Sequence, residues 1–237
     1  MISGSNRDPE FADPSKLAVG RATWNGDGVW FRTATGRHPR DARLSGYFRV
    51  SGVVIKDASH IVVEDLIVEN FSNDGINVHG DSKGLVFRNI VSRNNGDDGF
   101  SIHDTVQVKV EGLHAFGNDY GIQDIGTSRS DFTGSLIESN RIYGVDFHGG
   151  VRSLRETVVR DNGLQQIRVT EQSCKPGAAD AGTPLYKAQV RLERVKVTAD
   201  GRPSVYVEKG SRIVAVGCSF DGEIRKAKGG VFEEEGK

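Results

Sequence analysis

The sequence predicts an all-β protein, a parallel β-helix in which each coil of the chain stacks on the coil before it. Three observations support this fold class. A glycine-led segment with alternating apolar residues recurs every 22–24 residues, a second alternating segment lies between successive copies, and no amphipathic helical pattern of about ten residues or more is present. The chain has 237 residues, enough for one large all-β domain with a continuous core.

The first repeated segment sets the period of the coils. Its copies are separated by steps of 24, 23, 24, 22 and 23 residues, and they begin at Gly28, Gly52, Gly75, Gly99, Gly121 and Gly144. A period near 23 residues with short strands does not fit a leucine-rich horseshoe, a helical solenoid or a propeller blade. A parallel β-helix fits it.

The second repeated segment reads IVVEDLIVEN, LVFRNIVSRN, VKVEGLHAFGN, FTGSLIESN and LRETVVRDN in successive coils. Each copy closes on an asparagine, at Asn70, Asn94, Asn118, Asn140 and Asn162. Asparagine tolerates the left-handed backbone conformation and bonds to its own neighbours, so we expect the stacked copies to form a ladder.

Alternation within each glycine-led strand assigns the side chains to two faces. The residues expected to point inward are Ile76, Val78, Phe100, Ile102, Ile122, Val145 and Phe147. Those expected to point outward are Asn77, His79, Ser101, His103, Asp146 and His148. Strict alternation in GIQDIG would bury an aspartate, so we expect a one-residue bulge that turns Asp124 outward and Ile125 inward.

The period also divides the chain into regions. We expect the β-helix to span residues 21–225, with a protruding loop insertion at 171–188. The segment 1–20 is polar and low in pattern, typical of an added leader or a cut point, so the chain could be a fragment of a longer protein. The acidic, glycine-bearing tail at 226–237 offers little to pack and is expected to fray.

Composition limits the partners. With 31 Lys+Arg against 32 Asp+Glu, the formal charge of -1 argues against a nucleic-acid partner. We expect no membrane span, because no apolar run of about 18 residues occurs, and no intact signal peptide. An extracellular or periplasmic location is favoured but stays open, as does the oligomeric state. Cys174 and Cys218 could form one disulfide or could be two buried apolar residues.

Stacking turns residues that are one period apart into neighbours, about 4.8 Å apart along the axis. Four consecutive coils should therefore gather along one turn the residues Asp74, Asp97, Asp98, Asp119, Tyr120 and Tyr143. The strand face beside that turn should carry Asn77, His79, Ser101, His103, Gln123, Asp124, Asp146 and His148. An elongated groove of carboxylates, imidazoles and tyrosines could accommodate an extended sugar chain.

The repeats at 28–168 resemble the right-handed parallel β-helix repeats of the pectate-lyase-like superfamily. The resemblance covers more than half of the chain and implies a right-handed, single-stranded β-helix. It is specific for architecture, because the same scaffold carries lyases, epimerases, hydrolases, phage tailspikes and adhesins.

One motif resembles a catalytic signature. The stretch YGVDFHG, residues 143–149, is similar to the YG-x-D-P-H-D motif of mannuronan epimerases and related alginate lyases. It matches at Tyr143, Gly144, Asp146 and His148, and it departs from the motif at Phe147 and Gly149. The resemblance implies that Tyr143 and His148 transfer protons at C5 of a uronate ring, while Asp146 orients the histidine or binds sugar.

These considerations define two groups of candidate residues. The catalytic candidates are Tyr143, His148, Asp146, His103 and Asp98. The substrate-binding candidates are Asp74, His79, Lys83, Asp97, Asp104, Asp124, Arg129 and Arg141. Proton abstraction beside a carboxylate needs a base, an acid and a cation that neutralises the carboxylate. Lys83, Arg129 and Arg141 are the candidates for that cation.

The leading hypothesis is a carbohydrate-active β-helix that binds an acidic polysaccharide and acts by C5 proton abstraction, as an epimerase or a lyase. A non-catalytic structural or surface repeat protein is the alternative, since aspartate-glycine before a strand is ordinary turn chemistry. A polygalacturonase-like hydrolase comes third: Asp74 and Asp98 stand one coil apart (98-74=24), but GNDYG occupies the place of the expected Gly-His-Gly. No cofactor is certain, although clustered carboxylates suit calcium.

Overall fold

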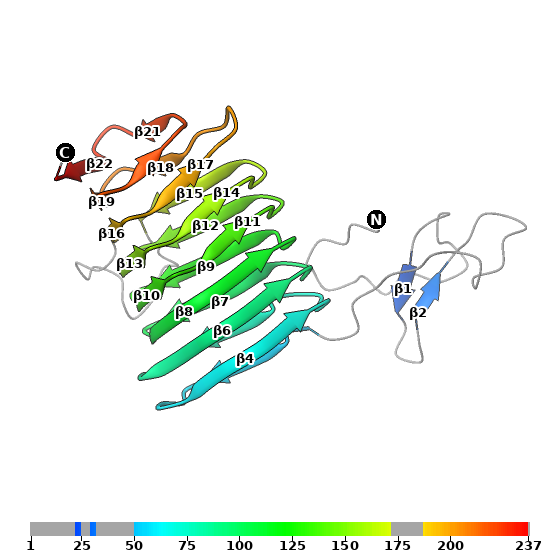
Figure 1. The fold of residues 1–237 in the computed structure, drawn as a ribbon. Coiled ribbons are helices and arrows are strands. Elements are labelled where there is room, and N and C mark those ends of the chain that lie inside the picture. Colours follow the sequence, from blue (N-terminus) through cyan, green and yellow to red (C-terminus); the bar gives the residue numbers. More distant parts are fainter. Residues whose placement is uncertain (1–21, 25–28, 32–49, 172–186, 237) are drawn as a thin grey trace, which may run out of the picture. The chain divides into compact units, whose positions relative to one another are not determined.

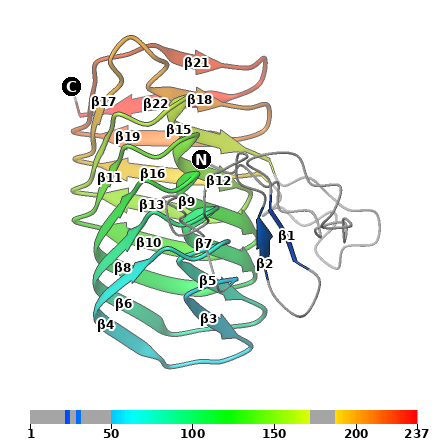
Figure 2. The ribbon, with the colours of Figure 1, turned by 90° about the vertical axis from the view of Figure 1, so that its right-hand side faces the viewer.

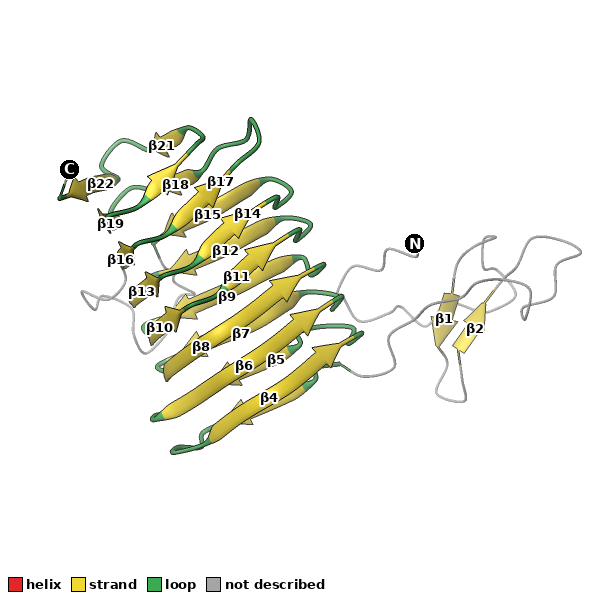
Figure 3. Cartoon of the chain, viewed as in Figure 1, coloured by secondary structure: helices red, strands yellow, loops and turns green. Residues whose placement is uncertain are grey.

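The computed structural model describes residues 22–24, 29–31, 50–171 and 187–236. It divides the chain into two units, Met1–Gly46 and Tyr47–Lys237. The described part of the second unit consists of strands and loops, without a helix (Figure 3). Among the described residues no helix could therefore cross a membrane.

The second unit is a parallel β-solenoid with two long sheets. Its strands succeed one another along the axis in chain order, from cyan to red in Figure 1. The 8-stranded sheet, stacked in order in Figure 2, consists of β3 (Val53–Lys56), β5 (Ile76–His79), β7 (Asp98–Asp104), β9 (Tyr120–Gly126), β12 (Tyr143–His148), β15 (Gln165–Thr170), β18 (Val205–Val207) and β21 (Ile224–Lys226). All pairings within this sheet are parallel.

The 12-stranded sheet completes each coil. Its strands are β4 (Val62–Glu69), β6 (Leu85–Arg93), β8 (Gln107–Phe116), β10 (Arg129–Thr133), β11 (Leu136–Glu138), β13 (Val151–Arg155), β14 (Val158–Arg160), β16 (Gln189–Glu193), β17 (Lys196–Thr198), β19 (Arg212–Val216), β20 (Ser219–Phe220) and β22 (Val231–Glu235). The strand β8 pairs with both β10 and β11. The one long strand of the early coils is thus replaced by two short strands in the later ones.

The core lies between the sheets and follows the predicted alternation. The seven residues expected to point inward from Ile76 to Phe147 all have no exposed surface. Phe87, Phe100, Phe132 and Phe147 form a run of ring contacts with centroid distances of 4.9, 5.8 and 6.4 Å. Burying such rings from neighbouring coils stabilises the stack by removing apolar surface from water.

The glycines at the start of the strands of the 8-stranded sheet have no room for a side chain. A Cβ on Gly75 would lie 2.1 Å from the Ser92 Oγ, and one on Gly144 would lie 2.5 Å from the Asn162 Nδ2. The turn before each strand therefore packs tightly against the polar ladder inside the solenoid, and no side chain fits there.

The predicted asparagine ladder is present at Asn118, Asn140 and Asn162, but its first rung is Asn95 in place of Asn70 and Asn94. Asn95, Asn118, Asn140 and Asn162 are buried, and the side-chain amides are joined from coil to coil at 3.0, 3.2 and 2.9 Å. Only the first two closing asparagines, Asn70 and Asn94, have the left-handed backbone. In later coils Gly117, Ser139 and Asp161 take that conformation instead, which frees the following asparagine to point inward.

The chain ends differ from the expected boundaries. The strand after Gly28 is present as β2 (Val29–Phe31), but it pairs antiparallel with β1 (Ala22–Trp24) rather than with a coil. The expected fraying tail instead forms β22, in parallel register with β19. Its Phe232 ring packs 5.5 Å from the ring of Phe220, which supplies the apolar contact that the acidic sequence did not suggest. Most of the expected insertion, including Cys174, lies outside the described residues, and Cys218 is half-buried.

Candidate functional site

His79, His103 and His148, predicted to share one strand face, lie in one column on the outer side of the 8-stranded sheet. The register sets His103 and His148 on either side of Ile125, and His79 follows the pair of Val78 with Ile102. All three are partly exposed. The column therefore brings together residues that are up to 69 positions apart in sequence (148-79=69).

An acid cluster lies at the start of the same strands. One carboxylate oxygen each of Asp74, Asp97 and Asp98 lies within 4.8 Å of the other two. The side-chain Nδ2 of Asn73 donates to the Asp74 Oδ2 at 2.9 Å, and the side-chain Nδ2 of Asn77 donates to the same oxygen. The backbone N–H of Asp98 donates to the other oxygen at 3.3 Å.

Burial and mutual repulsion make these carboxyls reluctant to ionise. Burial, with the charge of Asp97 beside it, raises the pKa of Asp74 to about 6, against the hydrogen bond from Asn77. The pKa of Asp98 is raised well above its ordinary value, first by burial and then by Asp74 and Asp97. The cluster can thus hold a proton near neutral pH, which suits a general acid.

A hydrogen-bonded path joins the acid cluster to the histidine column. The Ser101 Oγ lies 2.6 Å from the Asp98 Oδ2 and 3.0 Å from the His103 Nε2. Ser101 belongs to the outer side, as alternation predicted, but it is only 1% exposed. Burial also lowers the pKa of His103, so its imidazole tends to be neutral.

The YGVDFHG strand carries a second cluster of polar side chains, around His148. The Nε2 of His148 lies 2.9 Å from the Asp146 Oδ2, and the Nδ1 of His148 lies 2.9 Å from the Thr170 Oγ1. The two contacts orient the imidazole ring between Asp146 and Thr170; in the tautomer with Nε2–H, Nε2 donates to Asp146 and Nδ1 accepts from the Thr170 hydroxyl. The predicted orienting role of Asp146 thus has a geometric basis.

An arginine missed by the sequence reasoning completes this group. The Arg168 Nη1 donates to the Asp146 Oδ2 at 3.3 Å, and its guanidinium carbon lies 5.2 Å from the ring centroid of Tyr143. Tyr143 in turn contacts Tyr120 at a centroid distance of 5.5 Å. The period contained a signal for Arg168, because it follows Asp146 by one coil (168-146=22) and is paired with it in the register.

The prediction for Asp124 was wrong. No bulge forms: Asp124 pairs with Ile102 and Phe147 in the inward column, and Ile125 pairs with His103 and His148 in the outward one. The carboxylate has no exposed surface and lies 2.7 Å from the Nε of the equally buried Arg152. Hydroxyls of Ser128 and Ser130 also donate to it. A buried cation from the next coil makes the aspartate tolerable inside, so it cannot bind substrate.

The three cations proposed for the substrate carboxylate have other contacts or lie in another sheet. Arg141 binds Asp119 and the backbone oxygens of Gly117, Asn95 and Gly96, so it fastens neighbouring turns. Lys83 pairs with Asp81 at 2.9 Å in an exposed turn. Arg129 belongs to β10, in the other sheet. Asp104 accepts the backbone N–H of Gly80 at 2.8 Å and stabilises a turn.

The acid cluster has the ligand chemistry that a hard cation requires. Calcium binds carboxylate and carbonyl oxygens, and Asp74, Asp97 and Asp98 converge their oxygens at one place. In addition, the Oδ1 of the buried Asp98 has no hydrogen-bond partner. These residues fit calcium, which would supply charge neutralisation for the cluster and for an acidic ligand.

The family assignment agrees with this architecture. Residues 27–178 match the family model described as right handed beta helix region, which is more than half of the chain. The chain therefore belongs to this family, and its coils form a right-handed β-helix. Neither the curated proteins nor the solved structures contain a match to the chain.

Proposed function

We propose that the protein binds an acidic, uronate-containing polysaccharide along the outer side of the 8-stranded sheet and acts by C5 proton abstraction, as an epimerase or a lyase. One observation carries the proposal. Arg168 contacts both the Tyr143 ring and Asp146, and Asp146 holds His148, so a phenol, a cation and an oriented imidazole form one continuous group. These are the three functions that the chemistry requires.

Each member of the group has a defined part in the proposed reaction. His148 Nδ1, released by the Thr170 hydroxyl, takes the proton from C5, and the electron pair of the broken C–H bond moves into the substrate carboxylate. Arg168 neutralises the developing charge there. In an epimerase Tyr143 returns a proton to the opposite face of C5. In a lyase that electron pair returns to form a double bond between C4 and C5 as the bond from C4 to the bridging oxygen breaks, and Tyr143 protonates that oxygen.

The hydrolase hypothesis fits the geometry less well. An inverting glycosidase keeps its two carboxyl groups about 6.5 to 9.5 Å apart to leave room for water. Oxygens of Asp74 and Asp98 lie within 4.8 Å of each other, in a cluster that also includes Asp97. Such close acids suit a shared proton or a bound cation better than two separate roles.

Incubation with alginate and pectin tests the proposal. Elimination produces ultraviolet absorbance, epimerisation changes the NMR epimer ratio, and hydrolysis produces reducing ends without unsaturation. We expect one of the first two activities, and a loss of about 100-fold or more in His148→Ala and Tyr143→Phe.

His114→Ala is the matched control, because His114 belongs to the other sheet, where it pairs with Glu138 at 2.9 Å. Full activity in His148→Ala would refute the assignment. Reducing ends alone would favour the hydrolase, and inertness towards every substrate would favour the non-catalytic repeat protein.

An acidic polysaccharide substrate also leads us to propose an extracellular or periplasmic location. Fractionation of the source cells with an antibody against the chain tests this, and a purely cytoplasmic signal would contradict it.

A further inference from the structure

A groove crosses the outer side of the 12-stranded sheet, which does not carry the acid and histidine site. It has a volume of about 580 Å³ and extends over the first residues of β6, β8, β10 and β13. Val86 and Val151, both partly exposed, contribute apolar surface to it. This volume lies within the range of small-ligand sites, and apolar surface with a few charged groups is typical of such sites.

Three exposed cations line the groove: Lys109, Arg129 and Arg191. Lys109 and Arg191 lie in one column, three coils apart, with Asp131 and Ser153 between them. Arg129 pairs with Val151 in the neighbouring column. The lining acid is Asp131, and it is already engaged with Arg155 at 2.8 Å. Arg191 is likewise engaged, with Glu193 and Glu235. The cations that the groove offers to an anionic ligand are therefore Lys109 and Arg129.

The other arginines of this sheet show that the arrangement is unusual. Arg88 contacts Glu111 at 3.0 Å, Arg93 contacts Glu69 at 2.6 Å, and Arg160 contacts Glu138 at 2.7 Å. Within the ranges that the structure describes, Arg129 is the arginine of the 12-stranded sheet that contacts no carboxylate. Among the described residues, Lys109 on the adjacent strand β8 also contacts no carboxylate.

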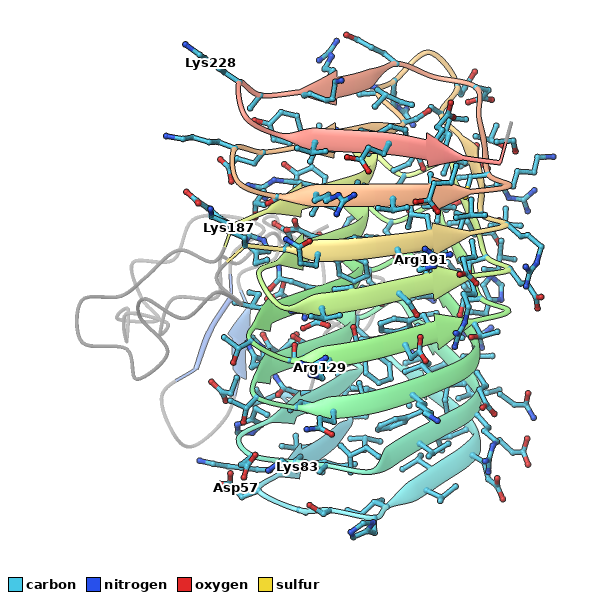
Figure 4. The ribbon with its side chains drawn as sticks, turned by 90° about the vertical axis from the view of Figure 1, so that its left-hand side faces the viewer. Asp57, Lys83, Arg129, Lys187, Arg191 and Lys228 are labelled. Atoms are coloured by element: carbon cyan, nitrogen blue, oxygen red, sulfur yellow. The ribbon has the colours of Figure 1, made fainter. Side chains whose placement is uncertain are left out.

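Figure 4 shows where these cations lie. Arg191 projects from the broad face of the sheet, and Arg129 lies toward the edge of the solenoid that also carries Lys83, Lys187 and Lys228. The cations are thus spread along the solenoid axis rather than concentrated at one point. A ligand that contacts several of them must be extended.

We propose that this groove is a second carbohydrate site, which binds a segment of an acidic oligosaccharide through Lys109 and Arg129. Successive strands are spaced by about 4.8 Å, a step comparable to one sugar residue of an extended chain. Carboxylates of the sugars pair with the cations, and the apolar faces of the rings cover Val86 and Val151. Both features of the groove then have a function.

The lining residues favour a sugar over a nucleic acid. Single-stranded nucleic acids bind through aromatic side chains on which bases stack, in addition to phosphate contacts. The residues that line the groove include no aromatic side chain. A sugar acid needs only charge and a flat apolar surface, and the groove supplies both.

This inference shares with the proposed function the premise of an acidic sugar ligand, but it involves a different sheet and different residues. The two can fail independently. Binding in the groove should persist in His148→Ala, whereas turnover should persist in groove variants assayed at saturating substrate.

The test measures binding of a short oligomannuronate to His148→Ala protein by calorimetry, with a neutral cello-oligosaccharide as the comparison ligand. Adding Lys109→Glu and Arg129→Glu together should raise the Kd roughly tenfold, because charge reversal replaces attraction with repulsion. Lys196→Glu is the matched control, an exposed lysine on β17 outside the groove, and should change the Kd less than about twofold. Raising the salt concentration should weaken binding.

Methyl NMR provides a second measurement that does not depend on how well the variants fold. Addition of the oligomannuronate should shift the methyl signals of Val86 and Val151 in the His148→Ala protein. The proposal is overturned by unshifted methyl signals, by equal binding of the neutral sugar, by equal loss in the Lys196→Glu control, or by preferential binding of oligothymidylate.

Discussion

The two sheets of this solenoid are built from the same repeat, but among the residues that the structure describes only the 8-stranded sheet has a cluster of like charges at the start of its strands. Outside the groove, the 12-stranded sheet pairs its outward arginines with carboxylates of neighbouring coils, as Arg88 does with Glu111 and Glu64. The 8-stranded sheet instead gathers Asp74, Asp97 and Asp98 at one place and buries two of them. Pairing with arginines relieves the repulsion between carboxylates, whereas the cluster of three aspartates keeps that repulsion in the folded protein.

This difference indicates where the molecule is organised for stability and where for function. Exposed ion pairs between coils hold the charged surface together at little energetic gain. Crowded, buried carboxyls oppose folding, and such arrangements with perturbed pKa values concentrate at functional sites. The comparison supports placing the site on the 8-stranded sheet without reference to any motif.

The largest expected effect concerns the ion pair that joins the two sheets through the interior. Arg152→Met would leave the buried Asp124 without its cation, and we expect the free energy of unfolding to fall by about 3–5 kcal/mol. Denaturation with urea measures the loss. The double variant with Asp124→Leu should recover most of it, because no uncompensated charge remains. Equal losses in the single and double variants would show that packing, not charge, governs this position.

A smaller effect should appear as a dependence of stability on pH. The folded protein binds a proton at Asp74 more tightly than the unfolded chain does, because the pKa rises from 3.8 to about 6. The contribution of this group to the free energy of unfolding is therefore complete below pH 3.8 and is lost as the pH rises through about 6. The loss should be roughly 2–3 kcal/mol.

Two variants separate this effect from that of the neighbouring imidazole. The lowered pKa of His103 acts in the opposite direction, reducing stability as the pH falls below its ordinary value of 6.5. Asp74→Asn should flatten the decline between pH 4 and 6, while His103→Gln should steepen it. A decline that is unchanged in Asp74→Asn would contradict the assigned cause.

The smallest effect is expected on the 12-stranded sheet. Arg88→Ala removes an exposed cation that contacts Glu111 and Glu64, and we expect little change in the free energy of unfolding because solvent screens such pairs. Thermal unfolding at low and high salt measures it, and the difference should shrink at high salt. A loss comparable to that of Arg152→Met would remove the distinction between the two kinds of ion pair.

Much of the site could be predicted from the period alone. A repeat of 22–24 residues places His79, His103 and His148 in one column, and it brings Asp74 next to Asp98. The same arithmetic pointed to Arg168, which was overlooked because it lies outside the YGVDFHG motif. Positions at equal offset become neighbours whatever the side chains are, so repeats predict proximity well.

The errors have a common physical source. The expected bulge at Asp124 assumed that an aspartate cannot lie inside, but Arg152, in the next coil of the other sheet, supplies the compensating charge. The expectation that Arg141 binds the substrate carboxylate did not consider that its guanidinium could donate to backbone oxygens of turns up to 46 residues earlier. Whether a polar group is buried or exposed depends on partners that no single segment contains.

The sequence by itself determined the coil length, the inward and outward alternation and the column of histidines, because a repeat fixes the vertical neighbours of each position. Only the tertiary structure decided which of those neighbours bond, which carboxyls lose their water, and which cations remain without a partner. Hydrogen bonds and pKa values depend on separations of a few ångströms between side chains from different sheets. Periodicity does not set those separations; the packing of the coils does.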